Sequence, residues 1–380
     1  MKANIYFDNA ATTPIDPRVV DAMIPILREN YGNPSSIHKE GRVSRSIIER
    51  ARKQVASYFN ASPSEFFFTS GGTEADNMIL RCSVHDLGVK HIITSPLEHH
   101  AVLHTAEELR DIDGIRLSLV KVDKKGKVDL EHLRELLDSG DKTLVSLMHA
   151  NNEIATRLPL KQVGEMCKEF DALFHSDTVQ TMGHYSFDFK DINIHFATCS
   201  AHKFHGPKGI GFLYVQNSVS LKPMITGGSQ ERNMRAGTEN IYGIVGLTKA
   251  LELAYEDLAG HQKHIQQLKS YMIQRLKAVI PDVHFNGDSE SEDSLYTVLS
   301  VCFPSTEIDE MLLYHLDIQG VSASGGSACS SGSNIGSHVL SAIGASADRP
   351  SVRFSFGRFN TKEEIDSCIE VLEKIFVKSA

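Results

Sequence analysis

The sequence has no tryptophan and few cysteines. Its six cysteines, spread over 380 residues, form neither a C-x-x-C pair nor a dense cluster, which excludes a disulfide framework and a cysteine-rich metal site. They are Cys82, Cys167, Cys199, Cys302, Cys329 and Cys368. Scattered, unpaired cysteines are typical of a reducing compartment, so the sequence predicts a cytoplasmic protein.

Long apolar runs and an excess of positive charge are also missing. No stretch approaches the ~18 consecutive apolar residues of a membrane span, and the N-terminus has no apolar run of signal-peptide length. The chain carries 39 Lys and Arg against 48 Asp and Glu, a formal net charge of −9. We therefore expect neither a membrane partner nor a nucleic-acid partner.

Short apolar runs alternate with helix-like stretches through the first two thirds of the chain. This alternation predicts βαβ units and a mostly parallel sheet covered by helices on both faces. A long amphipathic stretch over 241–279 follows, and beyond Pro281 the pattern changes to that of a smaller α+β domain. Two domains also fit the length, because a single core usually stops growing at ~250–300 residues. The apolar runs occupy 66–68, 91–93, 144–148, 173–176, 196–199 and 211–215.

The segment Ser70-Gly71-Gly72-Thr73-Glu74 comes directly after a predicted strand and opens a predicted helix. Backbone N–H groups and the helix dipole at such a place can hold an anion such as a phosphate. The P-loop pattern and the dinucleotide G-x-G-x-x-G pattern are both absent. A simple helix cap with glycines for a tight turn remains the alternative.

Lys203 and Asp177 each follow a predicted buried strand, and strand ends of open α/β sheets are where ligands bind. A lysine there is either an incidental solvated cation or a Schiff-base nucleophile. An acid on the neighbouring strand end favours the second reading. Pyridoxal phosphate needs an amine for its carbonyl carbon and a carboxylate for its pyridinium nitrogen.

Three histidines stand together as His99, His100 and His104. The last two have the i,i+4 spacing of metal ligands on a helix, but H-E-x-x-H is absent and no further ligand cluster follows, so we expect no metal. His99 lies closest to the strand-to-helix junction, where a flat imidazole can stack on a cofactor ring.

Cys329 differs from the other five cysteines. It lies in a Gly/Ser-rich loop over 322–337, a composition typical of mobile loops. An exposed loop thiol is useful chiefly as a nucleophile, whereas the others lie in apolar or helical patterns. Arg353, in an alternating strand-like run, carries a planar group suited to a carboxylate, although a surface ion pair is an equal alternative for it.

Together these motifs resemble the cysteine desulfurases of the class V aminotransferase family. The resemblance covers almost the whole chain. The motif Ser327-Ala328-Cys329-Ser330, which lies in a long loop, is similar to that of the family members that serve nitrogen fixation and housekeeping pathways. The motifs that carry it are Tyr6-Phe7-Asp8-Asn9-Ala10-Ala11-Thr12-Thr13, Tyr31-Gly32-Asn33-Pro34-Ser35-Ser36, Phe68-Thr69-Ser70-Gly71-Gly72-Thr73-Glu74, Met148-His149-Ala150-Asn151-Asn152-Glu153-Ile154 and Arg235-Ala236-Gly237-Thr238-Glu239-Asn240.

The resemblance implies a fold-type I pyridoxal-phosphate transferase with a seven-stranded, mostly parallel sheet. Its large cofactor domain would span 13–257, and a smaller α+β domain would combine 1–12 with 258–380 and carry the cysteine loop. The implied activity converts L-cysteine to L-alanine and leaves a persulfide on Cys329. A homodimer and a sulfur-acceptor or scaffold protein for iron–sulfur cluster assembly are the implied partners.

The resemblance also implies a role for each site residue. Lys203 would bind the cofactor covalently and later act as a base, and Cys329 would be the nucleophile. Asn152 and Arg353 would hold the substrate carboxylate, and Asn152 would also contact the cofactor. The remaining cofactor contacts would be Asp177 at the ring nitrogen, His99 on the ring face, Gln180 at the phenolic oxygen, Thr73, Ser200 and His202 at the phosphate, and Thr238 at the phosphate of the partner subunit.

Three positions depart from the family pattern, and other functions remain open. Ala155 stands where glycine is usual, His205 where an aromatic residue is frequent, and Ser229 where a third glycine is often found. The alternatives are a selenocysteine lyase or another class V lyase, a sulfur carrier that has lost catalysis, and a cysteine hydrolase that uses Cys329 with a histidine. The sulfur carrier without catalytic activity is disfavoured because Lys203 and Asp177 are both present.

Overall fold

The computed structural model describes residues 4–325 and 336–377. Its strands are β1 (Ile5–Tyr6), β2 (Phe66–Thr69), β3 (His91–Thr94), β4 (Arg116–Leu119), β5 (Thr143–Ser146), β6 (Leu173–Asp177), β7 (Phe196–Ser200), β8 (Gly211–Val215), β9 (His284–Phe285), β10 (Val298–Cys302), β11 (Val321–Ser322) and β12 (Ser351–Ser355). Its α-helices are α1 (Pro17–Glu29), α2 (Lys39–Ser57), α3 (Gly72–His85), α4 (His100–Asp113), α5 (Leu130–Leu137), α6 (Leu160–Glu169), α7 (Phe189–Ile192), α8 (Ile241–Glu256), α9 (Leu258–Val279), α10 (Leu312–Ile318), α11 (His338–Ala342) and α12 (Lys362–Phe376).

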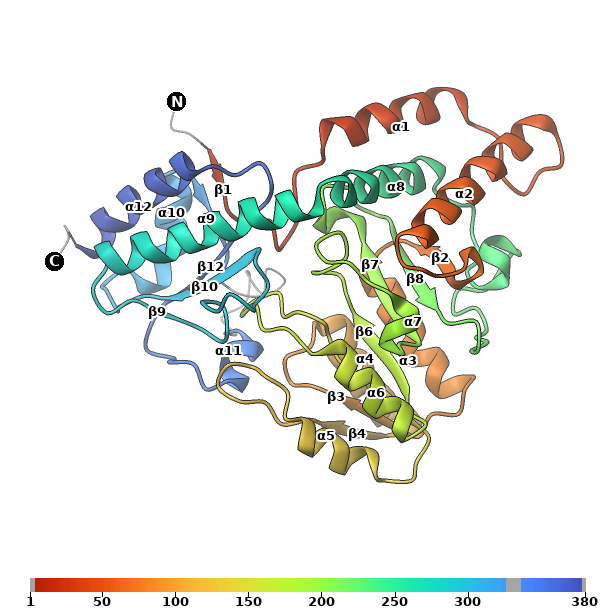
Figure 1. The fold of residues 1–380 in the computed structure, drawn as a ribbon, viewed down its shortest axis with the longest axis horizontal. Helices are drawn as coiled ribbons and strands as arrows, with labels where there is room; N and C mark the ends of the chain where they lie inside the picture. Colours follow the sequence, from red (N-terminus) through yellow and green to blue (C-terminus); the bar gives the residue numbers. More distant parts are fainter. Residues whose placement is uncertain (1–3, 326–335, 378–380) are drawn as a thin grey trace.

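Seven strands form the central sheet in the order β2-β8-β7-β6-β5-β3-β4. β8 pairs antiparallel with both β2 and β7, and every other pairing is parallel. Six strands therefore point the same way, and their carboxyl ends meet at one edge. The predicted α/β fold with a mostly parallel sheet is confirmed (Figure 1).

Helices cover both faces of this sheet, and the strand residues alternate between two apolar cores. Phe66 and Phe68 pack into a core with α2, α6 and α8, whereas Phe67 packs into a second core with α3 and α4. The strands read as continuous apolar runs because both of their faces are buried.

A third core lies beyond the sheet, where α9 and α12 pack against β10 and β12. The small antiparallel sheet has the order β12-β10-β9, and β1 pairs parallel with β11. Figure 1 shows β1 and the two chain ends on this side of the molecule. The division of the chain at residue 257 stays a prediction.

The amphipathic stretch over 241–279 forms two helices, because the chain breaks at Asp257 between α8 and α9. Asp257 has a non-helical backbone (φ −137°, ψ 51°), and its carboxylate accepts a hydrogen bond from the N–H of Gly260 at 3.2 Å. An aspartate in that position ends one helix and caps the next, a local choice that the apolar periodicity did not reveal.

Ala155 has a left-handed backbone with φ +63°. This conformation is costly for a residue with a Cβ atom, which accounts for the glycine that the family usually has there. The N–H of Ala155 donates to the carbonyl of Asn151 at 3.1 Å, and its own carbonyl accepts from the N–H of Leu295 at 2.8 Å.

Within the described residues, the structure has no helix that is both long and apolar enough to cross a membrane.

Candidate active site

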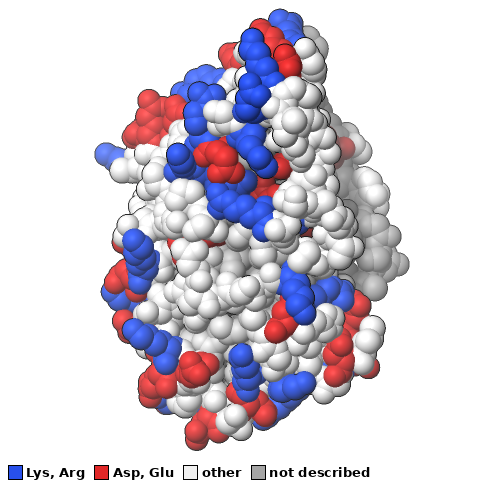
Figure 2. All heavy atoms as spheres, turned by 90° about the vertical axis from the view of Figure 1, so that its right-hand side faces the viewer, with Lys and Arg blue, Asp and Glu red and all other residues white. Residues whose placement is uncertain are grey.

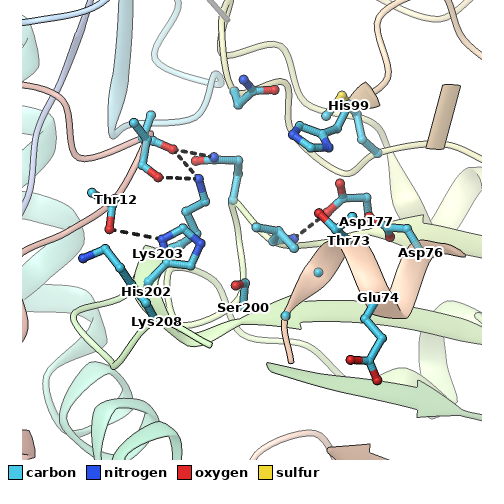
Figure 3. A pocket seen from close by; sticks show the side chains of 18 of the residues that line it. Thr12, Thr73, Glu74, Asp76, His99, Asp177, Ser200, His202, Lys203 and Lys208 are labelled. Carbon is cyan, nitrogen blue, oxygen red and sulfur yellow. Dashed lines mark hydrogen bonds between the residues drawn. The ribbon is translucent and has the colours of Figure 1, made fainter. Parts of the chain in front are cut away.

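A cavity of about 550 Å³ lies at the carboxyl edge of the central sheet (Figure 3). Residues that follow β2, β5, β6 and β7 line it, together with the N-terminal segment 10–12 and Arg353 of β12. Nine of the predicted site residues meet here, drawn from segments far apart in the sequence. They are Thr73, His99, Asn152, Asp177, Gln180, Ser200, His202, Lys203 and Arg353.

Lys203 follows β7 in a single 3₁₀ turn, and its amine reaches across the cavity to the N-terminal segment. Nζ donates to the carbonyl oxygens of Ala10 at 2.7 Å and Ala11 at 2.8 Å. The side-chain amide of Gln180 donates to the same Ala10 carbonyl at 3.0 Å. The amine is thus held in the cavity by backbone carbonyls of the N-terminal segment.

Asp177 is the last residue of β6 and is buried. Its Oδ1 accepts the N–H of Val179 at 2.9 Å and lies 3.5 Å from the hydroxyl of Thr198. Burial, reinforced by the nearby Asp76, raises the pKa of Asp177 to about 6, and His99 opposes the shift. A carboxyl in this setting is stabilised in its ionised form by any cation that binds beside it.

His99 caps the N-terminus of α4, and its ring points into the cavity (Figure 3). Its Nδ1 accepts the N–H of Ala101 at 3.1 Å, so the proton of the neutral ring lies on Nε2. Burial lowers the pKa of His99, with Asp177 opposing. A neutral, fixed imidazole of this kind presents a flat face to a bound ring.

Four groups suited to an anion also line the cavity. They are Thr73 in the first turn of α3, Ser200, His202 and the amine of Lys208, and Figure 3 shows His202 and Lys208 next to each other. Burial and the charges of the two lysines lower the pKa of His202 to about 4, so its ring is neutral, and its Nδ1 lies 3.2 Å from the Thr12 hydroxyl.

The backbone where α3 begins beside β7 and β8 leaves no room for larger residues at two glycine positions. A Cβ atom at Gly72 would lie 2.7 Å from a methyl of Val179, and one at Gly211 would lie 2.1 Å from the carbonyl of Cys199. These glycines let the start of α3 approach β7 and β8 closely. The Ser70 N–H is already bonded to Glu74 at 3.0 Å, so only the rest of this segment is available to a ligand.

Arg353 enters the cavity from the small antiparallel sheet, and only 2% of the residue is exposed. Its guanidinium donates to the backbone carbonyl of Asn152 at 3.0 Å and to Asp8 at 2.9 Å. Within 4–325 and 336–377, its Nε has no hydrogen-bond partner. Asp8 therefore fixes the orientation of a cation that still has donor capacity for a carboxylate.

Ser324 pairs with Arg353 through backbone hydrogen bonds of 2.7 and 3.3 Å. The chain thus passes Arg353 shortly before the segment that contains Cys329. Cys329 itself lies outside the described residues. The other five cysteines are all buried, as their sequence patterns predicted.

Thr238 does not line the main cavity. It belongs to a second cavity of about 170 Å³ beside it, lined also by Ser70, Glu231 and Arg235. A buried ion pair between Arg52 and Glu231, at 2.7 Å, ties this region to α2.

His100 and His104 contact each other, with Nδ1 and Nε2 3.1 Å apart. In the part of the chain that the structure describes, no group of three or more His, Cys, Asp or Glu residues is arranged to hold a metal ion.

Three polar residues of the cavity were missed by sequence reasoning, namely Thr12, Asp76 and Lys208. Lys208 had a local signal, since it follows Gly206-Pro207 in the tight turn after Lys203. Asp76 lies one helical turn after Thr73 on α3, which was visible, but nothing in the sequence says which helix face meets the sheet. Thr12 comes from a distant segment.

The donor set fits pyridoxal phosphate. An amine, a buried carboxyl and a flat neutral imidazole lie around one cavity, matching the carbonyl carbon, ring nitrogen and ring face of that cofactor. The hydroxyls of Thr73 and Ser200 and the Lys208 amine match its phosphate. Gly72 and Gly211 allow the close backbone approach of α3 to β7 and β8 that places Thr73 and Ser200 along the cavity.

Comparisons with known proteins give one consistent family. The family model described as aminotransferase class-V matches residues 5–368. The cysteine desulfurase IscS of Dictyoglomus turgidum is 43% identical over 382 residues, which cover 100% of this chain and 96% of that protein. Among solved structures, a NifS-like protein has a TM-score of 0.90 at 39% identity, covering 98% of this chain and 99% of its own. The structure of SspA in complex with cysteine has a TM-score of 0.81 at 30% identity, covering 94% and 100%.

Proposed function

Because this chain belongs to the class-V aminotransferase family, we propose that it is a pyridoxal-phosphate-dependent cysteine desulfurase. It converts L-cysteine to L-alanine and retains the sulfur as a persulfide on Cys329. The observation that carries the proposal is the placement of Lys203 and Asp177 in one cavity with Arg353. An amine, an acid and a carboxylate clamp are what such a reaction needs around an amino-acid substrate.

Pyridoxal phosphate supplies an electron sink for the charge left when an amino acid loses its α-proton. Lys203 would bind its carbonyl carbon, and the carboxylate of Asp177 would keep its ring nitrogen protonated. His99 would face the ring, and Gln180 would donate to the phenolic oxygen. Thr73, Ser200 and His202 would hold the phosphate.

Arg353 and Asn152 bind the carboxylate of the substrate. Asp8 and the Asn152 carbonyl already fix the guanidinium, so little side-chain entropy is lost when the substrate binds. The Nζ atom of Lys203 would take the proton from the substrate Cα, acting as general base.

The Cys329 thiolate then attacks the substrate sulfur. An S–S bond forms, the bond between Cβ and sulfur breaks, and its electron pair stays with the carbon skeleton. That skeleton takes up protons and leaves as alanine, while the enzyme keeps the sulfur as a persulfide. The net change is L-cysteine plus a thiol giving alanine plus a persulfide, which balances without an oxidant.

The proposed function is tested by incubating the purified protein with L-cysteine and a thiol reductant. We expect a yellow protein that produces alanine and sulfide in equal amounts. A parallel reaction with L-selenocysteine separates this activity from a selenocysteine lyase, which would act on selenocysteine alone. A colourless protein without alanine formation would contradict the proposal and favour a hydrolase.

Replacement of Arg353 is expected to weaken substrate binding. Arg353→Ala should raise the KM for cysteine about 10- to 100-fold, since a hydrogen bond to a charged group contributes ~1.5–3 kcal/mol. Arg353→Lys should recover part of the loss, because it keeps the charge but not the planar fork. Steady-state kinetics measure both. Arg349→Ala, which removes an arginine paired with Asp282, is the matched control, and an unchanged KM in Arg353→Ala would assign the clamp elsewhere.

We propose that the enzyme is a homodimer in which the partner subunit's Thr238 reaches the phosphate end of the cavity. Within one chain, Thr238 lies in the neighbouring cavity instead. Large apolar side chains are exposed around α1, α2 and the start of α8, including Tyr31, Ile37 and Tyr242. Figure 2 faces this side of the molecule and shows broad uncharged areas between interspersed cations and anions.

Hybrid dimers test this sharing of the site. A Thr238→Ala homodimer should bind the cofactor more weakly. A hybrid of Thr238→Ala with Lys203→Ala subunits should regain one site of wild-type affinity, since the intact Lys203 then meets the intact Thr238 of the other chain. Cofactor titration by absorbance measures the recovery. A hybrid as weak as the Thr238→Ala homodimer would place Thr238 in its own subunit's site.

The same proposal places the enzyme in the cytoplasm and gives it a protein acceptor. A persulfide must pass its sulfur on before the next turnover, so an acceptor or scaffold protein for iron–sulfur cluster assembly is the expected partner. The name of the IscS relative supports this assignment.

A further inference from the structure

Asp76 has no role in the proposed reaction, yet it lines the cavity beside Asp177. It lies on the buried face of α3 and is only 1% exposed. Figure 3 shows Asp76 beside Asp177, on the side away from Lys203. Two acids therefore lie next to each other in a place that solvent barely reaches.

Asp76 faces a histidine that is equally buried. Its Oδ1 lies 3.5 Å from Nε2 of His175, and neither atom has a hydrogen-bond partner within the described residues. The other ring nitrogen, Nδ1, lies 2.8 Å from the hydroxyl of Ser146. Two facing polar atoms without partners are costly unless one proton lies between them.

Thr198 joins the two acids from β7. Its hydroxyl lies 3.5 Å from Oδ1 of Asp177, and it also hydrogen-bonds Asp76. A hydroxyl has one proton to donate, so it cannot satisfy both carboxylates at once. The carboxyl that does not accept the Thr198 proton needs another hydrogen-bond donor or must itself be protonated.

The charges around the pair decide which acid keeps a proton. Burial raises the pKa of Asp76 to about 7, and burial with the charge of Asp76 raises that of Asp177 to about 6. The Lys203 amine lies on the Asp177 side of the cavity, and His99 opposes the rise in the pKa of Asp177. Two carboxylates this close are not both ionised in a buried site, so the proton stays on Asp76, the acid farther from Lys203.

Two other titratable groups face this region. Burial lowers the pKa of His175 to about 4, so its ring is neutral. Glu98, just before α4, is also buried, and burial raises its pKa to about 8, with Asp177 and Asp76 adding to the shift. Its Oε1 accepts the Met148 N–H at 3.0 Å and the Ser95 hydroxyl at 2.9 Å. Neither group neutralises a second anion beside Asp177.

We propose that Asp76 is a positioning residue that keeps its proton over the pH range in which Asp177 ionises and thereby holds Asp177 ionised for the ring nitrogen of the cofactor. Asp76 donates its proton to Nε2 of His175, whose Nδ1–H donates to Ser146. Because Asp76 then carries its own proton, the Thr198 hydroxyl can donate its proton to Asp177. The assignment of Asp177 rests on the proposed function, whereas the protonation of Asp76 does not.

The first test uses the cofactor-free protein and infrared spectroscopy of its carboxyl groups. Wild type should show the carbonyl-stretch band of a buried protonated acid that disappears as the pH rises through about 7. Asp76→Asn should lack the band that disappears near pH 7. Glu98→Gln should keep that band and lose only the band of the Glu98 carboxyl, which disappears at a higher pH, about 8. Asp86→Asn, at the far end of α3, is the control. A band unchanged in Asp76→Asn would overturn the proposal.

The second test uses the holoenzyme. The visible band of the cofactor in wild type should change in a step near the same pH, and that step should be lost in Asp76→Asn, whose amide can donate to His175 at every pH. Superimposable wild-type and Asp76→Asn profiles would overturn the coupling to Asp177. A colourless protein that still shows the carbonyl-stretch band of Asp76 would contradict the proposed function but support the protonation of Asp76.

Thr198→Val gives an independent variant of nearly the same shape in case Asp76→Asn does not fold. Loss of the shared donor should move the midpoint of the Asp76 infrared component to higher pH by a measurable shift, because the ionised carboxyl loses a stabilising bond. An unmoved midpoint would show that the two acids do not share this hydroxyl and would overturn the proposal.

Discussion

Lys203→Ala is expected to lose both the covalent attachment of the cofactor and the turnover of cysteine. The structure places the Nζ atom in the cavity, held by the carbonyls of Ala10 and Ala11. Loss of the general base alone should lower kcat by about 10²- to 10⁴-fold. Borohydride reduction followed by mass spectrometry should locate the cofactor on Lys203 in wild type and on no residue of the variant.

Lys208→Ala is the matched control, because it removes another lysine amine from the same cavity. It should keep the borohydride adduct and lose only cofactor affinity through the phosphate. A Lys203→Ala protein that still forms the adduct would reassign the attachment site, and Lys208 would be the first candidate.

Cys329→Ala is expected to retain the cofactor and to bind cysteine while releasing no sulfur. The yellow colour and the spectral change on adding L-cysteine should match wild type, because no cofactor contact is lost. Alanine and sulfide formation should fall by at least about 10²-fold, since the nucleophile is gone. Rapid-mixing absorbance separates the two steps, and trapping with a thiol alkylator should find no persulfide.

No other described cysteine is placed to replace it. All five are buried, and burial raises the pKa of Cys82 to about 12, so its thiol is not ionised at neutral pH. Cys82→Ser is the control and should keep full sulfur release. Retained turnover in Cys329→Ala would mean that sulfide leaves without a protein persulfide, as in a lyase.

The sheet could be predicted well because its strands are marked locally. Phe66-Phe67-Phe68 and Leu173 to Ser176 are apolar runs between helix signals, and both form strands. β4 carried no such signal, because Arg116–Leu119 lies at the sheet edge with partly exposed side chains. The amphipathic pattern over 241–279 did not by itself mark the turn at Asp257 that separates α8 from α9.

Short-range sequence determined which residues end a strand or open a helix, and therefore put Asp177, Lys203 and Thr73 at one sheet edge. Only the tertiary structure decided what meets them. Ala10 reaches Lys203 across 193 residues, and Asp8 reaches Arg353 across 345. Asp76 lies beside Asp177 because α3 packs on the sheet with that face. Hydrogen bonding and apolar periodicity act over a few neighbours, whereas these contacts depend on how whole layers pack, which no local pattern encodes.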